Sequence, residues 1–249
     1  MMTTTTIEQI PPLQRPETIT LAAAENDRVL ELLNSLDEPD WSKPTDCSAW
    51  DVRALAAHVL GGMEAFATFP EFVHQMRAGG KAAGDGPFID GMTAVQVNER
   101  AALTRSQLLD RLADVGPRAA RRRARFPALM RRMPMKQVVA GVEETWKMGY
   151  LLDIVLTRDT WMHRVDLARA TGHPMVLTPE HDGRIIAEVV AEWARRHARS
   201  FELHLQGPAG GTYVAGRDGE EIEIDAVEFC RILAHRATGV GLLAHEVPF

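Results

Sequence analysis

Residues 157–171 constrain the fold most, because they join a helical pattern of apolar residues to three polar side chains at helical spacing. The stretch reads TRDTWMHRVDLARAT. Asp159 and His163 are four positions apart and Asp166 follows three later, so a helix places all three on one face. Polar groups turned toward a core need partners, since burying them unpaired costs several kcal/mol. The stretch therefore predicts a helix whose polar face meets another side chain, a water or a metal ion.

The first 175 residues are predicted to form a helical bundle. Apolar residues recur at helical spacing in four regions, which cover residues 19–36, a segment opening near Ser48, 92–115 and about 134–171. Gly61 and Gly62 are costly inside the second helix, so a kink or an end is predicted there. The glycine-rich stretch 77–91 is predicted to be a mobile loop, and Gly116-Pro117 to end the third helix. The threonine-rich lead-in is predicted to be frayed.

Residues 176–249 change in character and predict a small α+β domain. Residues 178–200 are predicted to form one amphipathic helix with Pro179 in its first turn. Three strands are predicted from FELHLQG, GTYVAG and EEIEID, followed by a last helix that ends at Gly239 and a tail that forms a strand or docks. The predicted fold class is mainly α with a small α+β part: an N-terminal four-helix bundle, 1–175, and a C-terminal α+β domain, 176–249.

Composition and charge exclude several classes of protein. Of 249 residues 45% are hydrophobic and 25% are charged, which is typical of a globular protein. The net charge of -6 argues against nucleic acid as a partner, so the arginine-rich stretch 118–136 is interpreted as a solvated helix face and loop. No window has the apolar length of a membrane span, and the N-terminus lacks the apolar core of a signal peptide. A cytoplasmic protein is expected.

Three residues on two predicted helices form a candidate metal site: His58, Asp159 and His163. Imidazole and carboxylate ligands suit zinc or a similar divalent ion, and facing helices of a bundle often hold such ligands. Three protein ligands leave one coordination position open, as in catalytic sites. The alternatives are a surface ion pair between Asp159 and His163 and a hydrogen-bonded core histidine at His58. Cys47 has no base paired with it in the local sequence and is interpreted as a small buried hydrophobic residue.

Several motifs occur together in the order seen in one known family. WSKPTDCSAWDVRALAAHVLG has a Trp, then Pro-Thr-x-Cys, Trp-x-Val and a helix that ends in His58. An acid, Asp159, lies four residues before His163-Arg164-Val165-Asp166-Leu167. GPAGG, FCRILAHR and the ending EVPF follow in the last part of the chain. Over nearly its whole length the chain resembles the mycothiol-dependent maleylpyruvate isomerase family, within the broader DinB-like superfamily.

The resemblance implies a DinB-like four-helix bundle that holds one divalent metal, typically zinc, through His58, Asp159 and His163. It implies mycothiol, the low-molecular-weight thiol of actinobacteria, as the thiol cosubstrate. It also implies that Arg236, on the last helix of the second domain, lies near the active site, where a guanidinium can hold a substrate carboxylate or enolate. The alternative for Arg236 is a residue that complements the helix dipole. The family carries Glu where this chain has Asp159, and usually Gly where it has His235.

The predicted function is that of a metal-dependent, mycothiol-using isomerase or thiol transferase acting on a small electrophilic molecule. Two alternatives remain: a metal- and thiol-binding regulatory protein without activity, and a hydrolase that uses metal-bound hydroxide. The chain is expected to be a monomer or a homodimer, with no nucleic-acid or membrane partner. Asp166 is predicted either to hold the second ring nitrogen of His163 or to form a salt bridge with Arg53 or another basic group.

Overall fold

The structure is a computed structural model that describes residues 4–249, and it contains two compact units. The bundle unit consists of Arg15–Arg132 and Asp159–Met175. The sheet unit consists of the N-terminal residues up to Gln14, Met133–Arg158 and Val176–Phe249. The sequence placed one domain boundary between residues 175 and 176. As a boundary between folding domains, that position stays a prediction.

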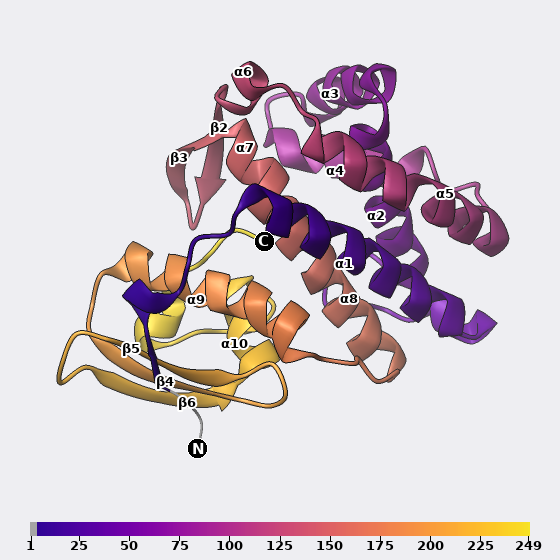
Figure 1. Ribbon diagram of the computed structural model, residues 1–249. Coiled ribbons are helices and arrows are strands. Elements are labelled where there is room, and N and C mark those ends of the chain that lie inside the picture. Colours follow the sequence, from indigo (N-terminus) through magenta and orange to yellow (C-terminus); the bar gives the residue numbers. More distant parts are fainter. Residues whose placement is uncertain (1–3) are drawn as a thin grey trace. The chain divides into compact units, whose positions relative to one another are not determined.

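Four helices, labelled in Figure 1, build the bundle unit. They share one apolar core. They are α1 (Arg15–Ser35), α2 (Val52–Ala67), α5 (Arg105–Ala124) and α8 (Leu156–Thr171). Each helix contributes side chains to this core, among them Leu33, Leu55, Leu60, Leu108, Leu112 and Leu167. Their spacing follows the helical period, which is why the sequence pattern located these helices.

Two further helices, α3 (Phe69–Ala83) and α4 (Phe88–Asn98), replace most of the predicted loop 77–91. A Cβ atom on Gly91 would lie 2.2 Å from the carbonyl oxygen of Gly79. The glycines therefore allow the two helices to approach closely, and the prediction of a mobile loop is wrong.

The prediction of one helix over 92–115 is also wrong: α4 ends at Asn98 and α5 starts after Thr104, whose hydroxyl accepts from the backbone N–H of Gln107. Gly116 and Pro117 lie inside α5.

α2 runs unbroken from Val52 to Ala67, so the helix does not end at Gly61-Gly62, and a kink at this pair stays a prediction. Gly61 lies against Gln96 of α4, and a Cβ atom added to Gly61 would be 2.6 Å from the Cβ atom of Gln96. The glycine makes room for this buried glutamine, whose amide nitrogen donates to the side chain of Gln75 over 3.0 Å.

A β-hairpin stands where the sequence predicted the start of a long helix. Strands β2 (Pro134–Val139) and β3 (Val142–Lys147) pair antiparallel, joined by Ala140 and Gly141, both at positive φ. Two residues at positive φ are the usual connection of a tight hairpin, so the turn and the alternating exposure of the strands explain the difference. The chain is helical again only from α7 (Met148–Tyr150), which leads through a π-helical turn (Leu151–Val155) into α8.

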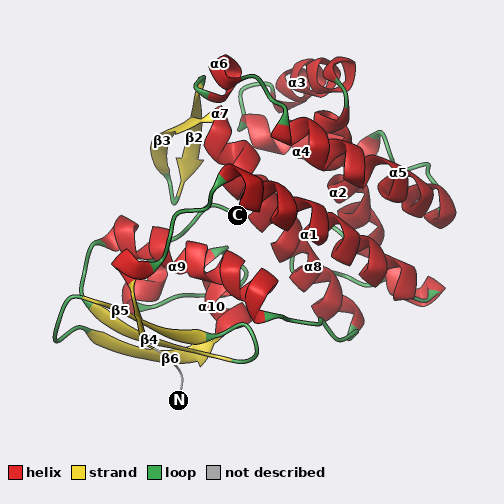
Figure 2. Ribbon diagram, in the orientation of Figure 1, coloured by secondary structure: helices red, strands yellow, loops and turns green. Residues whose placement is uncertain are grey.

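The sheet unit contains a four-stranded sheet (Figure 2) of β1 (Thr4–Thr6), β4 (Phe201–Gln206), β5 (Gly211–Ala215) and β6 (Glu220–Asp225). The order is β1-β5-β4-β6; β4 and β5 are antiparallel, and β1–β5 and β4–β6 are parallel. The three C-terminal strands are confirmed. The lead-in was expected to be frayed, yet its β-branched threonines 4–6 form the edge strand β1. Residues 1–3 of that lead-in lie outside the described chain.

Two helices cover one face of this sheet, α9 (Arg184–His197) and α10 (Ala226–Leu233). Trp193 of α9 is fully buried, and its ring centroid lies 4.7 Å from that of Phe201 on β4 and 5.3 Å from that of Phe229 on α10. The helix predicted over 178–200 is present as α9 after a π-helical turn (Pro179–Gly183). The tail contains a 3-10 turn (Gly241–Ala244) and no strand among its described residues.

A buried group of charged side chains joins α9 to the preceding parts of the sheet unit. Arg158 is 2% exposed and contacts the carboxylates of Glu188 and Glu192. The hydroxyl of Tyr150 donates to Glu192 over 2.7 Å, and burial raises the pKa of this hydroxyl above its usual value. Such a group resists separation, since removing one partner leaves a buried charge without compensation. It fixes the hairpin-to-helix segment against α9.

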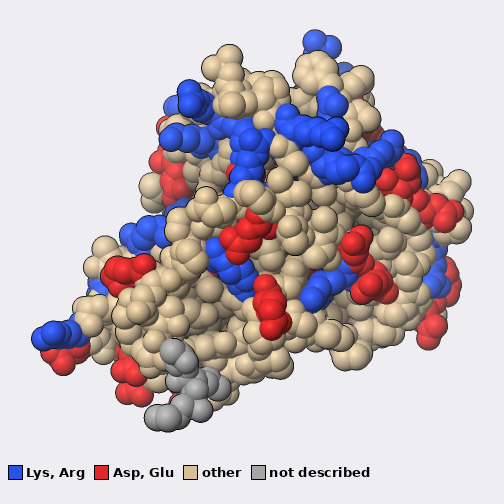
Figure 3. Space-filling view, viewed as in Figure 1, with Lys and Arg blue, Asp and Glu red and all other residues tan. Residues whose placement is uncertain are grey.

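Exposed arginines cover the second half of α5 and the short helix α6 (Ala128–Arg131), where Lys and Arg gather in Figure 3. Arg118, Arg121, Arg122, Arg125 and Arg132 are exposed to solvent. Arg118 forms an ion pair with Asp114 one helical turn away. This agrees with the interpretation of the stretch as a solvated helix face.

The fold class is confirmed: the chain is mainly helical, with an N-terminal helical bundle and a small α+β part. Within residues 4–249, no helix combines the length and apolar character that crossing a membrane requires.

Candidate metal centre

His58 reaches the core of the bundle unit because of where α2 begins. Asp51 caps the helix by accepting from the backbone N–H of Ala54 over 2.8 Å, which fixes the first turn. From that start, Leu55 and Val59 face the apolar core, and His58 lies two turns into the helix. The side chain of His58 is 10% exposed.

Asp159 and His163 lie on α8, and the structure brings both to His58. The Nε2 atom of His163 is 3.2 Å from Oδ1 of Asp159, and the Nε2 atom of His58 is 3.9 Å from Oδ2 of the same carboxylate. The two imidazole rings are 4.9 Å apart between centroids and nearly perpendicular, at 86°. One ligand atom from each of the three side chains lies within 4.8 Å of the others. The three residues that the sequence selected are therefore together.

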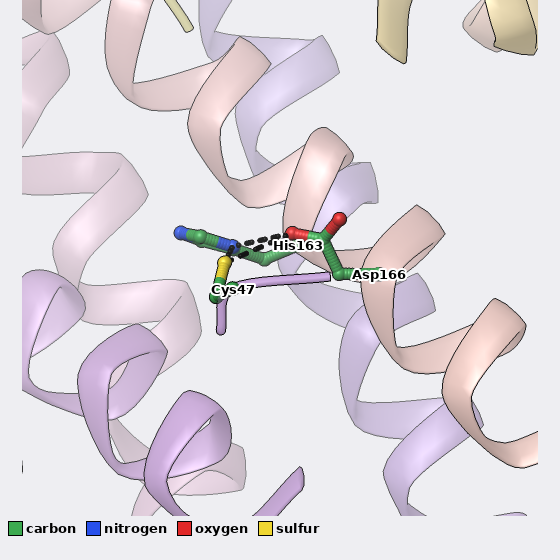
Figure 4. A group of neighbouring side chains, drawn as sticks. All are labelled: Cys47, His163 and Asp166. Atoms are coloured by element: carbon green, nitrogen blue, oxygen red, sulfur yellow. Dashed lines mark hydrogen bonds and ion pairs between the residues drawn. The ribbon is translucent and has the colours of Figure 1, made fainter. Parts of the chain in front are cut away.

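Asp166 contacts the other nitrogen of the His163 ring (Figure 4). Its Oδ2 atom lies 3.1 Å from Nδ1 of His163, and Asp166 is fully buried. Of the two alternatives for Asp166, the structure shows contact with His163, whereas Arg53 contacts Glu38, Leu103 and the ring of Trp41. A carboxylate on the second nitrogen of a ligating histidine fixes the tautomer and the orientation of the ring.

Cys47 differs from its prediction as a buried hydrophobic residue. Its thiol donates to Oδ2 of Asp166 over 3.4 Å, and its sulfur lies 4.0 Å from Nδ1 of His163. Half-buried, it also packs against the apolar core of the bundle unit. Sequence reasoning missed this contact because Cys47 and Asp166 are far apart in the chain. The one signal was the position of Cys47 inside the same motif as His58.

Trp50 is a second contributor, which the sequence supplied only as the Trp of the Trp-x-Val motif and without a role. Its ring lies 4.9 Å from that of His58 between centroids, with an angle of 30° between the planes, and 6.4 Å from that of His163. Trp50 is half-buried, so one part of the indole covers His58 while another part is accessible to solvent.

The environment of His163 favours positive charge on its ring. Burial by itself lowers the pKa of His163, but the carboxylates of Asp159 and Asp166 outweigh burial, so the pKa lies well above its usual value. A cation bound at Nε2 would replace the proton there and meet the same two carboxylates. The charge of the site is thus suited to a positive ion.

The donor set fits a divalent metal ion. His58 and His163 each offer Nε2 and Asp159 offers a carboxylate oxygen, which is the ligand type of mononuclear zinc sites. Asp159 is one-third exposed, so the group is accessible from one side. The bundle unit holds another group of possible ligands, Glu71, His74 and Glu99. None of the three is buried, and His74 and Glu99 are exposed.

Arg236 belongs to the sheet unit and follows the end of α10 by three residues, so its prediction as a residue of the last helix is wrong. α10 ends at Leu233 because His235 adopts a left-handed conformation, with φ of 61°. The guanidinium of Arg236 donates from Nη1 to the carbonyl oxygen of Ala234 over 3.1 Å. This contact is the one expected of a residue that complements a helix end, and a role of Arg236 toward substrate stays a prediction.

Comparison with known families shows to which family this chain belongs. Residues 22–168, more than half of the chain, match the family described as "Mycothiol maleylpyruvate isomerase N-terminal domain". The chain belongs to this family. The matched region starts in α1 and ends in α8, so it includes His58, Asp159, His163 and the loop that carries Cys47.

Two solved structures share the fold of this chain. Both are crystal structures of the mycothiol-dependent maleylpyruvate isomerase, one of them of a variant in which a histidine is replaced by alanine. Identity is 17% and 18%, the TM-score is 0.57 in each case, and the match covers 94% of this chain and 93% of theirs. At this identity the likeness shows the fold. A comparison with curated proteins gives no match.

Proposed function

We propose that this protein is a divalent-metal-dependent enzyme that uses mycothiol to act on a small electrophilic molecule, as an isomerase or a thiol transferase. Membership of the mycothiol maleylpyruvate isomerase N-terminal domain family supports the choice of thiol. The observation that carries the proposal is the convergence of His58, Asp159 and His163 within 4.8 Å at one partly accessible place. A cytoplasmic location, where such a thiol is found, is part of the proposal.

In this proposal His58, Asp159 and His163 hold the metal, with zinc as the first candidate. A divalent metal with an open position lowers the pKa of a bound thiol and so provides a thiolate at neutral pH. The protein contributes the arrangement of the ligands: Asp166 orients the ring of His163, and α2 and α8 hold the two histidines on rigid elements. The one-third exposure of Asp159 leaves the thiol a route to the site.

The reaction proposed is addition of the thiol sulfur to an electrophilic carbon of the substrate. Release of the thiol after rotation about a carbon–carbon bond gives isomerisation, whereas retention of the carbon–sulfur bond gives a conjugate. Arg236 is proposed to stabilise negative charge that develops on the substrate, since a guanidinium binds carboxylate or enolate oxygens with two parallel hydrogen bonds. The side chain of Asp159 is shorter than that of the Glu in related isomerases, and His235 precedes Arg236 where the family usually has Gly. The substrate is therefore expected to differ from maleylpyruvate.

The experiment that tests this function measures metal content by mass spectrometry in the wild-type protein, His58→Ala and His163→Ala. We expect about one zinc or similar ion per wild-type chain and loss of the ion in both variants, because each removes one of three ligands. Binding of mycothiol, followed by calorimetry, should be lost together with the metal. His74→Ala is the matched control, since His74 is an exposed histidine paired with Glu99 in the same unit.

Two outcomes would contradict the proposal. A wild-type protein that takes up no metal after reconstitution would exclude the mechanism and favour a regulatory role. Turnover that persists in metal-loaded protein without any thiol would instead indicate a hydrolase. Thiol-dependent turnover on a panel of electrophiles, with analysis of the products, separates isomerase from transferase.

A further inference from the structure

We propose that the loop of residues 44–51 positions both histidines of the candidate metal centre, and that Cys47 and Trp50 are the positioning residues. This inference rests on the proposed function, because it concerns how the metal ligands are held. Cys47 acts on His163 through Asp166, and Trp50 acts directly on His58. Both residues come from the segment that leads into α2.

The first contact runs from Cys47 to Asp166 and on to His163. The thiol of Cys47 and Nδ1 of His163 approach the same oxygen, Oδ2 of Asp166, at 3.4 Å and 3.1 Å. A buried carboxylate that accepts two hydrogen bonds on one oxygen is held in a narrower range of side-chain rotation than one that accepts a single bond. Cys47 therefore fixes the group that fixes the ring of His163.

The geometry assigns Cys47 a positioning role and not that of a ligand at this centre. The sulfur lies on the Nδ1 side of the ring, whereas Asp159 approaches Nε2. In Figure 4 the other ring nitrogen of His163 points away from both Cys47 and Asp166. An ion held between His58, Asp159 and His163 would contact Nε2, so it would lie on the side of the imidazole opposite the thiol.

The second contact is the stacking of Trp50 on His58. The angle of 30° between the planes and the 4.9 Å between centroids leave the imidazole little freedom to turn about its Cβ–Cγ bond. The ring of His58 thus has the indole on one side and the ring of His163 nearly perpendicular to it. Trp50 keeps Nε2 of His58 aimed at Asp159.

The loop is held closed by its own hydrogen bonds, which couples the two contacts. The N–H of Thr45 donates to the carbonyl oxygen of Trp50 over 3.2 Å, and the N–H of Trp50 donates to that of Cys47 over 2.8 Å. The hydroxyl of Thr45 donates to the carbonyl oxygen of Trp50 over 2.8 Å and accepts from the N–H of Cys47 over 3.2 Å. Pro44 and Asp51 form an isolated β-bridge at the ends of the loop. A closed loop of this kind carries Cys47 and Trp50 as one body.

The test measures the affinity for cobalt(II) by competition with a chelator at fixed pH, together with the visible spectrum of the bound cobalt, in the full-length protein. We expect Asp166→Ala to weaken affinity about 10- to 100-fold and Cys47→Ala about 3- to 10-fold, as for one hydrogen bond to an orienting group. In the Asp166→Ala background, Cys47→Ala should add less than about twofold, because its partner is already absent. In each variant, the cobalt that binds should have a visible spectrum different from that in the wild type. A loss of stability alone would lower the amount of cobalt bound and leave its spectrum unchanged.

Conservative exchanges separate positioning from general packing. Cys47→Ser keeps a donor toward Asp166 and should bind cobalt more tightly than Cys47→Ala. Trp50→Phe keeps an aromatic ring over His58 and should bind more tightly than Trp50→Leu. Cys230→Ala is the matched control for cysteine removal, since Cys230 is buried in the sheet unit, and it should leave cobalt affinity unchanged. A circular-dichroism melt confirms that each variant is folded.

The outcomes distinguish this inference from the function on which it rests. A wild-type protein that binds no cobalt contradicts the proposed function. Wild-type binding with the same affinity and spectrum in Cys47→Ala and Trp50→Leu leaves the function standing and overturns the positioning role. A near-ultraviolet band of thiolate coordination in the wild type that disappears in Cys47→Ala would show that Cys47 is a ligand, which also overturns it.

Discussion

Two adjacent glycines in α2 have different surroundings, and this difference gives a test of packing at the residue scale. A Cβ atom on Gly61 would meet Gln96, whose side chain is buried and hydrogen-bonded to Gln75. A Cβ atom on Gly62 would meet nothing within 4 Å. Alanine at the two positions should therefore change the free energy of unfolding in opposite directions.

Gly61→Ala is expected to lower the free energy of unfolding by about 1–3 kcal/mol, because Gln96 must move out of its place. Gly62→Ala, the matched control, should raise it by about 1 kcal/mol, since alanine favours a helix more than glycine does. Urea unfolding followed by circular dichroism gives both values. Equal effects of the two exchanges would contradict the close packing of α2 on α4.

The candidate site shows which residues a sequence can supply and which it cannot. Asp159, His163 and Asp166 were found because helical spacing alone places them on one face of α8. Cys47 and Trp50 lie in an irregular loop, where no period predicts the direction of a side chain. The contact of Cys47 with Asp166 joins residues far apart in the chain, and that of Trp50 with His58 depends on how the loop folds onto α2, so only the structure provides them.

At the scale of the element, the end of α9 carries strain that a single exchange can relieve. Ala198 adopts the left-handed conformation, with φ of 52° and ψ of 31°, and its N–H donates to the carbonyl oxygen of Ala194. Glycine takes this conformation without the steric cost that a Cβ atom brings. Ala198 is exposed, so the exchange removes no buried contact.

Ala198→Gly is expected to raise the free energy of unfolding by about 1 kcal/mol. Ala113→Gly is the control, because Ala113 is an exposed residue inside α5. This exchange should lower the free energy of unfolding by about 1 kcal/mol. Thermal unfolding of the two variants beside the wild type provides the comparison. A lower melting temperature for Ala198→Gly would show that the helix does not end in this conformation.

The elements that the sequence predicted best are those with many buried residues. α2 and α9 are buried along most of their length, β4 buries every second residue, and all three are present. The hairpin β2–β3 was mistaken for a helix because its residues are nowhere fully buried, so its alternation is weak. Its turn at Ala140-Gly141 lacks the Asn-Gly or Asp-Gly pair that marks a tight turn most strongly.

At the scale of the whole molecule, stability should depend on pH through His197. Burial, and after it the neighbouring His245 and Arg199, together lower the pKa of this imidazole to about 4. Between the ordinary pKa of 6.5 and about 4, the unfolded chain therefore binds a proton that the folded chain does not. The contribution of His197 to stability is present above pH 6.5 and is lost as the pH falls toward 4.

His197→Asn removes this titration and is expected to flatten the fall in the free energy of unfolding between pH 6.5 and 4. The asparagine Oδ1 can still accept from the N–H of Arg199, which donates to Nδ1 of His197 over 3.0 Å. Urea unfolding at a series of pH values in this range, for wild type and variant, measures the two slopes. Parallel slopes would show that His197 takes up its proton in the folded state as readily as in the unfolded chain.

Much of the architecture followed from the sequence, including the helical bundle and the three C-terminal strands. The sequence did not predict which segments of the chain make up the sheet unit. Its edge strand β1 comes from the start of the chain, and its hairpin from the middle. Local patterns report which face of a segment is buried and cannot report which distant segment buries it. Thr4 pairs with Thr212 across the sheet, a partnership that no local window contains.

This parallel pairing of β1 with β5 has a consequence for the order of events during synthesis. The chain emerges from the ribosome N-terminus first, and the partner of Thr4–Thr6 is translated about two hundred residues later. α1, α2 and α5 can meet long before that point, since contacts at short sequence separation form first. β1, the first strand along residues 4–249, must therefore be among the last to acquire its hydrogen bonds. A nascent chain halted before β5 carries an unpaired threonine strand ahead of a helical bundle that has begun to fold.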